Sequence, residues 1–422
     1  MLERASARDR AHTVALTAVA FALRMAWGLI TRLPPAWDGY LYERGARSIA
    51  TGLGYSCFMF GPAADPRVPT AYYPVGYPAY LGALYAIFGV APWVITFAGA
   101  LAGSASVALT HRLALRVASR RAAFVAALAL ALMPSQWIFA AAPMTETLWG
   151  ALLALSAWLL VRGARWPLVA LSLAAAVYVR PQALVVAAAL PFALDLPIRE
   201  RAKRAAMTTA AVLALVAPWT LRNCRAIDGC ALVSANGGSN LAVGAMARSD
   251  GTYVLLTPQD GCKGVVGEIA RERCWRRVAW TRIREHPIAW ARRAGPKLHH
   301  TFAYEEAPAV YLGVANPSLF TDSLRERLKG LMTFGWMLTF GLALIAVAPI
   351  YPRRRLGDAA RVSIATVLSV AATHAVFFGG DRYHLPLAGP LLVIAATALR
   401  DAPRWVRSRS TMRLAELSKG DG

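Results

Sequence analysis

Long apolar blocks constrain this chain more than any other feature. Segments of about 20 residues with few charges recur along most of its length, and a helix of about that length crosses the hydrocarbon core of a bilayer. Such blocks must be helical, because lipid offers no hydrogen-bond partner to the backbone. Charged residues make up only 16% of the 422 residues, against about a quarter in a soluble domain. The sequence therefore predicts an all-α polytopic membrane protein.

About ten transmembrane helices are predicted. They cover residues 13–32, 92–117, 121–141, 145–161, 166–181, 182–197, 205–221, 328–350, 360–378 and 385–400. The apolar segment 76–89 is too short to span comfortably and is predicted to be a re-entrant or interfacial helix. The first block could be a signal peptide, but it is long, is interrupted by Arg24 and lacks a small-residue cleavage site. We interpret it as a retained first helix.

The basic residues predict an orientation. They cluster at Arg4/Arg8/Arg10, Arg112/Arg116/Arg120/Arg121, Arg162/Arg165, Arg199/Arg201/Lys203/Arg204, Arg353/Arg354/Arg355/Arg361 and in the tail from Arg400 to Lys419. All of these clusters fall on one side only if 76–89 does not span, as the positive-inside rule requires. We therefore expect a bacterial inner (cytoplasmic) membrane protein with both termini cytoplasmic. The same rule accounts for much of the net charge of +23, so no nucleic-acid partner is expected.

This topology divides the chain into four parts. Residues 1–221 form a transmembrane module with an outside loop at 33–91, and residues 222–327 form an extracytoplasmic segment of helical or mixed structure. Residues 328–400 form the C-terminal transmembrane helices, and residues 401–422 form a basic cytoplasmic tail. Within the outside segment, residues 272–294 mix Arg and Trp at near-helical spacing, which predicts a helix on the membrane surface.

The cysteines agree with this topology. All five lie in the two outside segments, where an oxidising environment lets disulfides persist. Cys224/Cys230 and Cys262/Cys274 are plausible local pairs that leave Cys57 unpaired, although four cysteines allow three pairings.

Two carboxylates are predicted at the outer ends of helices. Asp38 directly follows the first span and begins a short amphipathic helix that Gly52 and Gly54 end. It suits either a helix cap or a catalyst. Glu146 lies at the next outside turn, where the helix dipole also favours an acid. Two carboxylates that face one site suit glycosyl chemistry, whereas Glu43 is predicted to be a solvated surface charge.

Cations are predicted at the same depth. Arg180, Arg222 and Arg382 each lie at an outer helix end, and His384 stands beside the last of them. One such arginine is typically a residue that snorkels to the interface, but three together favour a shared anionic ligand such as a phosphate. Arg24 lies well inside the first helix, where an ionisable residue is a candidate functional group by default; the alternatives are that it snorkels outward or pairs with a carboxylate.

The order of several motifs identifies a family resemblance. The motifs are Asp38 with Tyr42, Gly52, Gly54 and Tyr55; a Pro-Gly-Tyr-Pro-type turn before 76–89; Glu146; Arg180-Pro181; Pro-Trp-x-x-Arg-Asn at 218–223; Asn-Gly-Gly-x-Asn-Leu-x-x-Gly at 236–244; and Arg-Tyr-x-x-Pro at 382–386. Over residues 11–400 the chain resembles the GT-C superfamily of membrane glycosyltransferases. The similar branch is glycosyltransferase family 39, with the protein O-mannosyltransferases and the lipid A aminoarabinose transferase.

The resemblance implies a reaction and a partner. The donor would be a polyprenyl-phosphate-linked sugar, and transfer to an acceptor hydroxyl at the outer face of the membrane would invert the anomeric carbon. Asp38 would accept the hydroxyl proton, with Glu146 as a second carboxylate and Tyr42 close by. Arg180, Arg222, Arg382 and His384 would stabilise the departing lipid phosphate. The acceptor could be a lipid, a glycan or a protein.

The sequence departs from the family pattern in two places. Gly39 follows Asp38 where protein mannosyltransferases carry a second acid, so the role of the other carboxylate is open. Tyr72 and Tyr73 stand where some relatives place an acidic residue that could bind a metal, so the sequence does not support a divalent metal or any other cofactor. The alternative function is a transporter or flippase for a lipid-linked sugar, which predicts polar residues along several spans or inverted repeats. Neither is evident.

Overall fold

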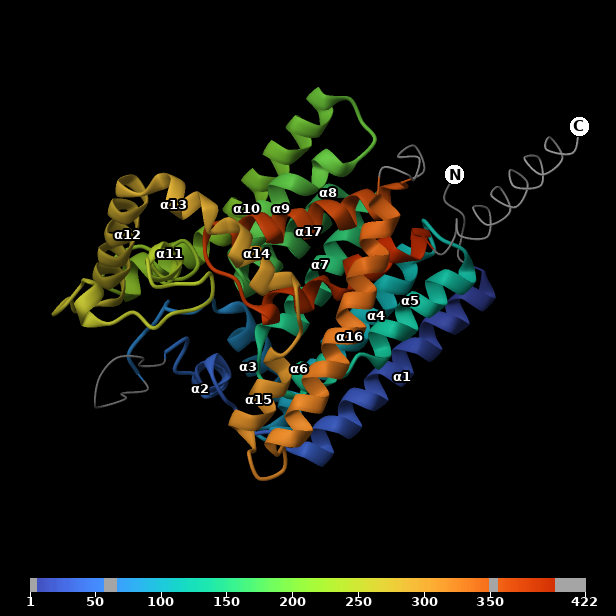
Figure 1. Cartoon of the computed structure of the whole chain (residues 1–422), viewed down its shortest axis with the longest axis horizontal. Helices are drawn as coiled ribbons and strands as arrows, with labels where there is room; N and C mark the ends of the chain where they lie inside the picture. The colour runs from blue at the N-terminus through green and yellow to red at the C-terminus, as the bar shows by residue number, and fades with distance from the viewer. Residues whose placement is uncertain (1–5, 57–66, 349–355, 399–422) are drawn as a thin grey trace, which may run out of the picture.

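A computed structural model describes residues 6–56, 67–348 and 356–398, and Figure 1 shows their arrangement. The elements are α1 (Ala7–Thr31), α2 (Asp38–Ala50), α3 (Gly76–Phe88), α4 (Pro92–Ala114), α5 (Arg120–Leu132), α6 (Pro134–Ala141), α7 (Thr145–Val161), α8 (Trp166–Val179), α9 (Ala183–Ala189), η1 (Leu190–Ala193), α10 (Ile198–Ala226), α11 (Gly237–Ala245), η2 (Pro258–Asp260), α12 (Glu268–Glu285), α13 (Pro287–Arg292), α14 (Ala294–Phe302), α15 (Ala307–Ala315), α16 (Asp322–Val347), α17 (Asp358–Val376) and η4 (Asp381–Leu387). A last helix begins at residue 388. No strand occurs among the described residues, which confirms the all-α fold class.

Within the described parts of the chain, five helices are long and apolar enough to cross a membrane: α1, α4, α10, α16 and α17. The pair α5 and α6 would make a sixth if this pair, bent by 48°, forms one span. Helices α7 and α8 and the stretch 183–193 are apolar but shorter. The chain is thus a multi-pass membrane protein, while the number of ten spans stays a prediction.

Segment 182–197 does not form the single helix that we predicted. Its α-helix ends at Ala189, a 3-10 turn covers 190–193, and Pro191 lies in that turn. A proline has no N–H to continue the helical hydrogen bonds, which explains the break.

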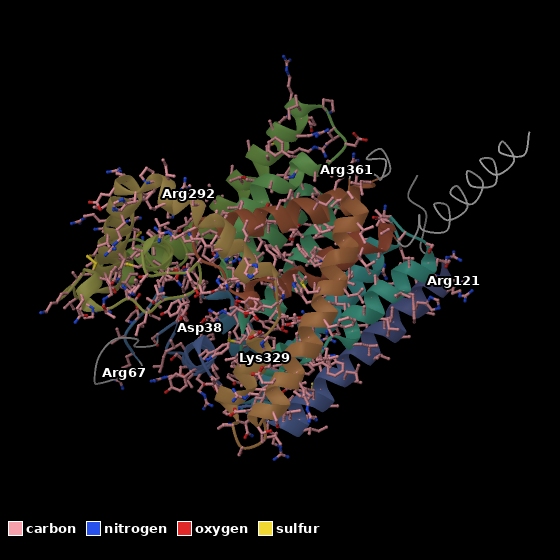
Figure 2. All side chains as sticks on the ribbon, in the orientation of Figure 1. Asp38, Arg67, Arg121, Arg292, Lys329 and Arg361 are labelled. Carbon is pink, nitrogen blue, oxygen red and sulfur yellow. A yellow bond between two sulfur atoms is a disulfide. The ribbon has the colours of Figure 1, made fainter. Side chains whose placement is uncertain are left out.

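Two ion pairs fix which segments share an end of the bundle. Arg120 Nε lies 3.1 Å from Asp9 Oδ1, and Arg361 Nη2 lies 3.6 Å from Asp195 Oδ2. Residues 9 and 120 meet at one end, so the chain between them leaves and returns once, through α1 and α4. Helix α3 therefore adds no crossing, in agreement with its predicted re-entrant or interfacial role. Figure 2 shows Arg121 and Arg361 well separated from Asp38.

The two predicted outside segments contact each other, and Figure 1 shows α2 from one and α11, α12 and α13 from the other on its left. Ala235 N donates to Ala71 O at 2.7 Å, and Ala71 N donates to Glu268 Oε2 at 2.8 Å. Two disulfides, Cys224–Cys230 and Cys262–Cys274, confirm both predicted pairs. Cys57 lies outside the described residues. Residues 272–294, predicted to form one helix on the membrane surface, differ from that prediction in two ways. The helix is divided into α12 and α13 before Pro287, and Trp275 is buried in a small core rather than facing outward.

Arg24 is buried within the bundle, and its partners explain why an arginine occurs inside a membrane helix. Its Nη1 donates to Ala20 O at 3.0 Å, and its Nη2 lies 3.4 Å from Leu130 O. Leu130 O would normally accept from residue 134, but Pro134 has no N–H to donate. Gly103 makes room for the side chain, since a Cβ there would lie 2.4 Å from Arg24 Nε. These contacts favour a structural role for Arg24, at the bend between α5 and α6.

Replacing Arg24 with methionine is expected to lower the free energy of unfolding by about 1–3 kcal/mol, because the carbonyl of Leu130 loses its donor. The cost should shrink in a Pro134→Ala background, where residue 134 supplies its own N–H. Thermal unfolding of the four proteins in detergent completes this double-mutant cycle. Equal costs of Arg24→Met in both backgrounds would show that Arg24 does not serve the bend.

Candidate active site

Asp38 is the first residue of α2, and it does not cap that helix. Trp37 occupies the N-cap position with no side-chain hydrogen bond to the helix, at a φ of 51° that residues other than glycine rarely adopt. The strained turn is supported by Tyr311, whose ring packs edge-on against Trp37 at 5.3 Å. Backbone strain of this kind is concentrated at functional sites. The cap interpretation of Asp38 is therefore excluded, and its carboxylate is free for other partners.

Those partners are a tyrosine and an arginine from distant parts of the chain. Tyr73 donates its hydroxyl to Asp38 Oδ1 at 2.7 Å, and Arg382 Nη2 lies 2.8 Å from Asp38 Oδ2. About a quarter of each charged side chain stays accessible, 25% for Asp38 and 23% for Arg382. Burial raises the pKa of Asp38, but the charges of Arg382 and Arg180 and the Tyr73 hydrogen bond together hold it below its ordinary value. Asp38 is thus a carboxylate at neutral pH.

Two tyrosines, one from α2 and one from the loop before α3, support Asp38. Tyr42, one turn along α2, is buried and packs against Tyr73 with ring centroids 5.0 Å apart. Burial, followed by the negative charge of Asp38, raises the pKa of Tyr73 far above its ordinary value. Tyr73 therefore keeps its proton and remains a hydrogen-bond donor to Asp38.

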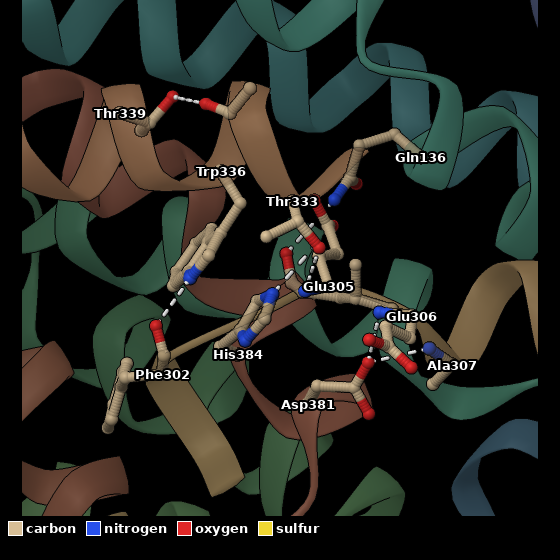
Figure 3. Close-up of polar contacts among 12 residues, drawn as sticks. Gln136, Phe302, Glu305, Glu306, Ala307, Thr333, Trp336, Thr339, Asp381 and His384 are labelled. Carbon is tan, nitrogen blue, oxygen red and sulfur yellow. Dashed lines mark hydrogen bonds and ion pairs between the residues drawn. The ribbon is translucent and has the colours of Figure 1, made fainter. Parts of the chain in front are cut away.

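Arg382 reaches Asp38 from η4, the short 3-10 helix that follows α17. Its guanidinium lies 5.0 Å from the centre of the Tyr383 ring, a cation–π contact. The start of η4 is anchored by Asp381, whose Oδ2 accepts hydrogen bonds from the backbone N–H groups of Glu306 and, at 2.6 Å, Ala307 (Figure 3). Arg382 is therefore held in place before any ligand binds.

Glu146 and Arg180 form a buried ion pair beside this site. Glu146 is 1% exposed, and its Oε1 lies 2.5 Å from Arg180 Nη2. Arg180 Nε also donates to Thr145 Oγ1 at 2.8 Å, and its guanidinium lies 5.5 Å from the Tyr383 ring that also contacts Arg382. The first turn of α7 and the end of α8 thus bring a second guanidinium to the Asp38–Arg382 pair.

Arg222 and His384 are not brought into the same cluster by their contacts. Arg222 donates to the carbonyl oxygens of Thr70 at 2.8 Å and of Tyr55 at 2.7 Å, so it fastens the outside loop to α10. Its guanidinium also lies 4.8 Å from the Trp219 ring. Because these contacts occupy both terminal nitrogens, the geometry favours a structural role for Arg222.

His384 is fully buried, and Figure 3 shows it beside Trp336 and Glu305. Its Nδ1 lies 2.6 Å from Thr301 O, and because a carbonyl can only accept, Nδ1 carries a proton. Its Nε2 faces Glu305 Oε1 at 3.7 Å, and its ring stacks on Trp336 with centroids 3.5 Å apart. Both nitrogens are directed at the protein, so the structure does not present His384 to a phosphate. Burial of His384 is the physical reason that this expectation is not supported.

Glu43 is not the solvated charge that we predicted. It is 5% exposed, forms an ion pair with Arg47 and accepts a hydrogen bond from Tyr85 at 3.2 Å. Glu43 lies five residues after Asp38 on α2, so its side chain points away from Asp38 and toward α3. Burial between α2 and α3 makes Glu43 a packing contact rather than a member of the site.

Sequence reasoning missed three side chains of the site region. Tyr73 and Tyr383 contact Asp38 and Arg382, and Glu305 faces His384. Tyr73 could have been found from the sequence, because Tyr72 and Tyr73 stand where some members of the resembled family place an acidic residue. No comparable signal pointed to Tyr383 or Glu305. Among residues 6–56, 67–348 and 356–398 no group of three or more His, Cys, Asp or Glu side chains could hold a metal, so we derive no step through one.

The glycines of the motif at 236–244 let α11 approach its neighbours closely. A Cβ on Gly238 would lie 2.4 Å from Glu272 O, and one on Gly244 would lie 1.7 Å from Phe377 O. The second contact matters for the site, because Phe377 begins the segment that leads to Arg382.

The change Gly244→Ala is expected to lower the free energy of unfolding by about 1–3 kcal/mol, because the new methyl group overlaps a backbone carbonyl that cannot rotate away. Gly330→Ala in α16 is the matched control, since no atom lies within 4 Å of a Cβ there. The measurement is thermal unfolding of the purified variants. Equal stability of the two variants would contradict the close approach of α11 to residue 377.

Comparisons with known proteins agree with this architecture. No family model and no curated protein matches the sequence. Among solved structures, the oligosaccharyltransferase AglB from Archaeoglobus fulgidus, in complex with an inhibitory peptide and a dolichol-phosphate, aligns with a TM-score of 0.53 at 13% identity, over 97% of this chain and 52% of that one. The apo form of the Archaeoglobus fulgidus oligosaccharyltransferase aligns with a TM-score of 0.51 at 13% identity, over 96% and 52%.

The chain thus spans about half the length of the archaeal enzyme. ArnT from Cupriavidus metallidurans, bound to undecaprenyl phosphate, is also similar, with a TM-score of 0.43 at 13% identity, over 92% of this chain and 77% of that one. Identities this low establish the fold and no more. At the level of fold, the resemblance predicted from the motifs is confirmed: this chain has the GT-C fold, which it shares with the archaeal oligosaccharyltransferase.

Proposed function

We propose that this protein is a glycosyltransferase that moves a sugar from a polyprenyl-phosphate donor to an acceptor hydroxyl at the outer face of the cytoplasmic membrane. One observation carries the proposal. A carboxylate held ionised by Tyr73 and Arg382 lies beside a second, buried Arg180–Glu146 ion pair, at the surface of a GT-C fold. Transfer of a sugar from a phosphate requires a base for the acceptor hydroxyl and positive charge that stabilises the leaving phosphate, and this cluster supplies both.

Asp38 acts as the base in this proposal. The acceptor oxygen attacks the anomeric carbon from the face opposite the phosphate, the bond from that carbon to the phosphate oxygen breaks, and the hydroxyl proton passes to Asp38. A carboxylate of low pKa is a weak base, but in an oxocarbenium-like transfer the proton leaves late, after the oxygen has become acidic. One displacement of this kind inverts the anomeric carbon.

Arg382 and Arg180 stabilise the leaving group. The lipid phosphodiester carries one negative charge, and breaking its bond to the sugar leaves a monoester that carries a second. A guanidinium suits this task because it stays charged and donates in a planar fork. The two arginines are 23% and 13% exposed, so their charges act in a partly desolvated site, where electrostatic stabilisation is stronger than in water.

Glu146 acts as a positioning residue in this proposal. Its carboxylate is buried and committed to Arg180, which leaves it no open path to the acceptor. Together with Thr145 it fixes the direction of the Arg180 guanidinium. The second carboxylate predicted from the sequence would thus serve the phosphate rather than the proton transfer.

The donor class is tested with purified protein in detergent micelles. Polyprenyl-phosphate sugars of several configurations are supplied alongside the corresponding nucleotide sugars, and release of polyprenyl phosphate is measured. We expect turnover of at least one lipid-linked sugar and of no nucleotide sugar. Turnover of nucleotide sugars alone would exclude the proposed donor, and net movement of an intact lipid-linked sugar across a bilayer without its cleavage would favour a flippase.

A further inference from the structure

An exposed aromatic ring stands at the edge of the active-site cluster. Tyr253, in the loop between α11 and η2, is 60% exposed, and its ring packs against Phe378 at 5.8 Å. Phe378 in turn lies 5.7 Å from Tyr383, whose ring contacts the Arg382 guanidinium. Three neighbouring rings therefore lead from Arg382 out to the solvent-facing Tyr253.

A second tyrosine approaches from the other outside segment. Tyr72 packs edge-on against Tyr73 at 5.0 Å, and Tyr73 donates to Asp38. Burial, and then the neighbouring Tyr253 and Asp38, raises the pKa of Tyr72 to about 12. Tyr72 therefore keeps its proton and lies one ring contact away from the tyrosine that donates to Asp38.

The loop that carries Tyr253 is held in place by several contacts. Gly379 N donates to Gly251 O at 2.8 Å, and Thr252 N donates to Asp250 Oδ1 at 2.9 Å. Gly251 has a φ of +115°, and a Cβ there would lie 2.9 Å from Lys297 N, so only glycine fits between the loop and α14. The ring of Tyr253 is thus presented on a fixed support, although most of it makes no protein contact.

We propose that Tyr253 and Tyr72 form an acceptor subsite that takes a sugar ring, so that the acceptor of this enzyme is a carbohydrate hydroxyl. A pyranose has an apolar face of C–H bonds that packs on a flat aromatic ring, while its hydroxyls point away from the ring and bond to water. Tyrosine suits this contact because it supplies large area at low entropic cost. The inference rests on the proposed glycosyl transfer and names its acceptor class.

The proposed acceptor subsite is more exposed than the residues proposed to bind the donor phosphate. Side-chain exposure rises from 13% at Arg180 and 23% at Arg382 to 25% at Asp38, and the residue exposure of Tyr253 reaches 60%. The less exposed arginines suit the lipid phosphate, and the more exposed Tyr253 ring suits the incoming acceptor. A sugar stacked on Tyr253 would bring a hydroxyl toward Asp38 from the solvent side.

The test uses the full-length protein in micelles with a lipid-linked sugar that it turns over. Octyl glycopyranosides of gluco, galacto and manno configuration serve as acceptor probes, and a peptide rich in Ser and Thr serves as the competing acceptor. We expect transfer to at least one glycoside and not to the peptide. Tyr253→Ala should raise KM for that glycoside by about tenfold or more, and Tyr253→Phe should not.

Two readouts identify the role of the ring. Hydrolysis of the donor by water needs no acceptor and should be unchanged in Tyr253→Ala. Saturation-transfer NMR should show contact along one C–H face of the glycoside, lost in Tyr253→Ala and kept in Tyr40→Ala. Tyr40 is the control because it is also an exposed tyrosine, on α2, and its hydroxyl accepts a hydrogen bond from Arg44.

Three outcomes overturn the inference: transfer to the peptide alone, donor hydrolysis without transfer to any glycoside, or an unchanged KM in Tyr253→Ala. Failure of the wild-type protein to cleave any lipid-linked sugar is a different result. It would refute the proposed function itself, and with it the acceptor subsite.

Discussion

Asp38→Asn is expected to lower kcat for sugar transfer by about 10²–10⁴-fold, the usual contribution of a positioned general base. Asparagine keeps the shape of the side chain and can still accept a hydrogen bond from Tyr73, but it cannot take up a proton from the acceptor. The loss should therefore appear in kcat while KM for the lipid donor changes little. The measurement is transfer from the lipid-linked sugar in micelles, with enzyme concentration checked by size-exclusion chromatography.

A matched control tests whether the loss of one negative charge, rather than the loss of the base, lowers the rate. Glu285→Gln removes an exposed carboxylate at the end of α12, which belongs to the other predicted outside segment and is in no described contact with the site. It should transfer at the wild-type rate. If Asp38→Asn retained wild-type kcat, Asp38 would not be the base, and the role of the whole cluster would have to be reassigned.

The second large effect is expected for Arg382. Arg382→Gln should lower kcat by about 10²–10³-fold, comparable to the loss of one donor that stabilises developing negative charge. It should also change the pH dependence. Asp38 must be ionised to act, so the rate falls as the pH drops through its pKa, and Arg382 helps to hold that pKa below its ordinary value. Removing the positive charge raises the pKa of Asp38 and moves the acid limb of the rate profile to higher pH.

The profile of kcat/KM between about pH 4 and pH 8 measures this shift. Arg382→Lys is the informative comparison, because it keeps the positive charge but loses the planar fork. The lysine variant should keep most of the wild-type acid limb while its kcat stays low. An acid limb that does not move in Arg382→Gln would show that Arg382 does not tune Asp38.

Much of the architecture could be predicted from charge and hydropathy alone. The clustering of arginines placed residues 9 and 120 at one end of the bundle and excluded a crossing by 76–89, and the Asp9–Arg120 ion pair agrees. Those arguments succeed because insertion and orientation in a membrane depend on the summed hydrophobicity of long segments and on the number of Lys and Arg residues beside them. The break at Pro191 was missed, because a single proline within an apolar stretch is compatible with either a kinked or an ended helix.

The site was predicted in part. Asp38, Glu146, Arg180 and Arg382 lie together because each follows or begins a helix at the same end, which the topology made visible. Tyr73 and Tyr383 could not be singled out, since interfacial tyrosines are common in membrane proteins and their contacts join residues far apart in the chain. The burial of His384 depends on Trp336 and Glu305, which belong to other elements, so sequence position near Arg382 was a poor guide.

The most direct test of the central claim is a cryo-EM structure of the protein with polyprenyl phosphate, the product that the proposed reaction releases. We predict that its phosphate lies within hydrogen-bond distance of the guanidinium groups of Arg382 and Arg180, with the Asp38 carboxylate facing the side from which the acceptor arrives. A phosphate bound elsewhere, with the Asp38–Arg382 and Glu146–Arg180 ion pairs left closed to the ligand, would contradict the assignment of this cluster as the active site.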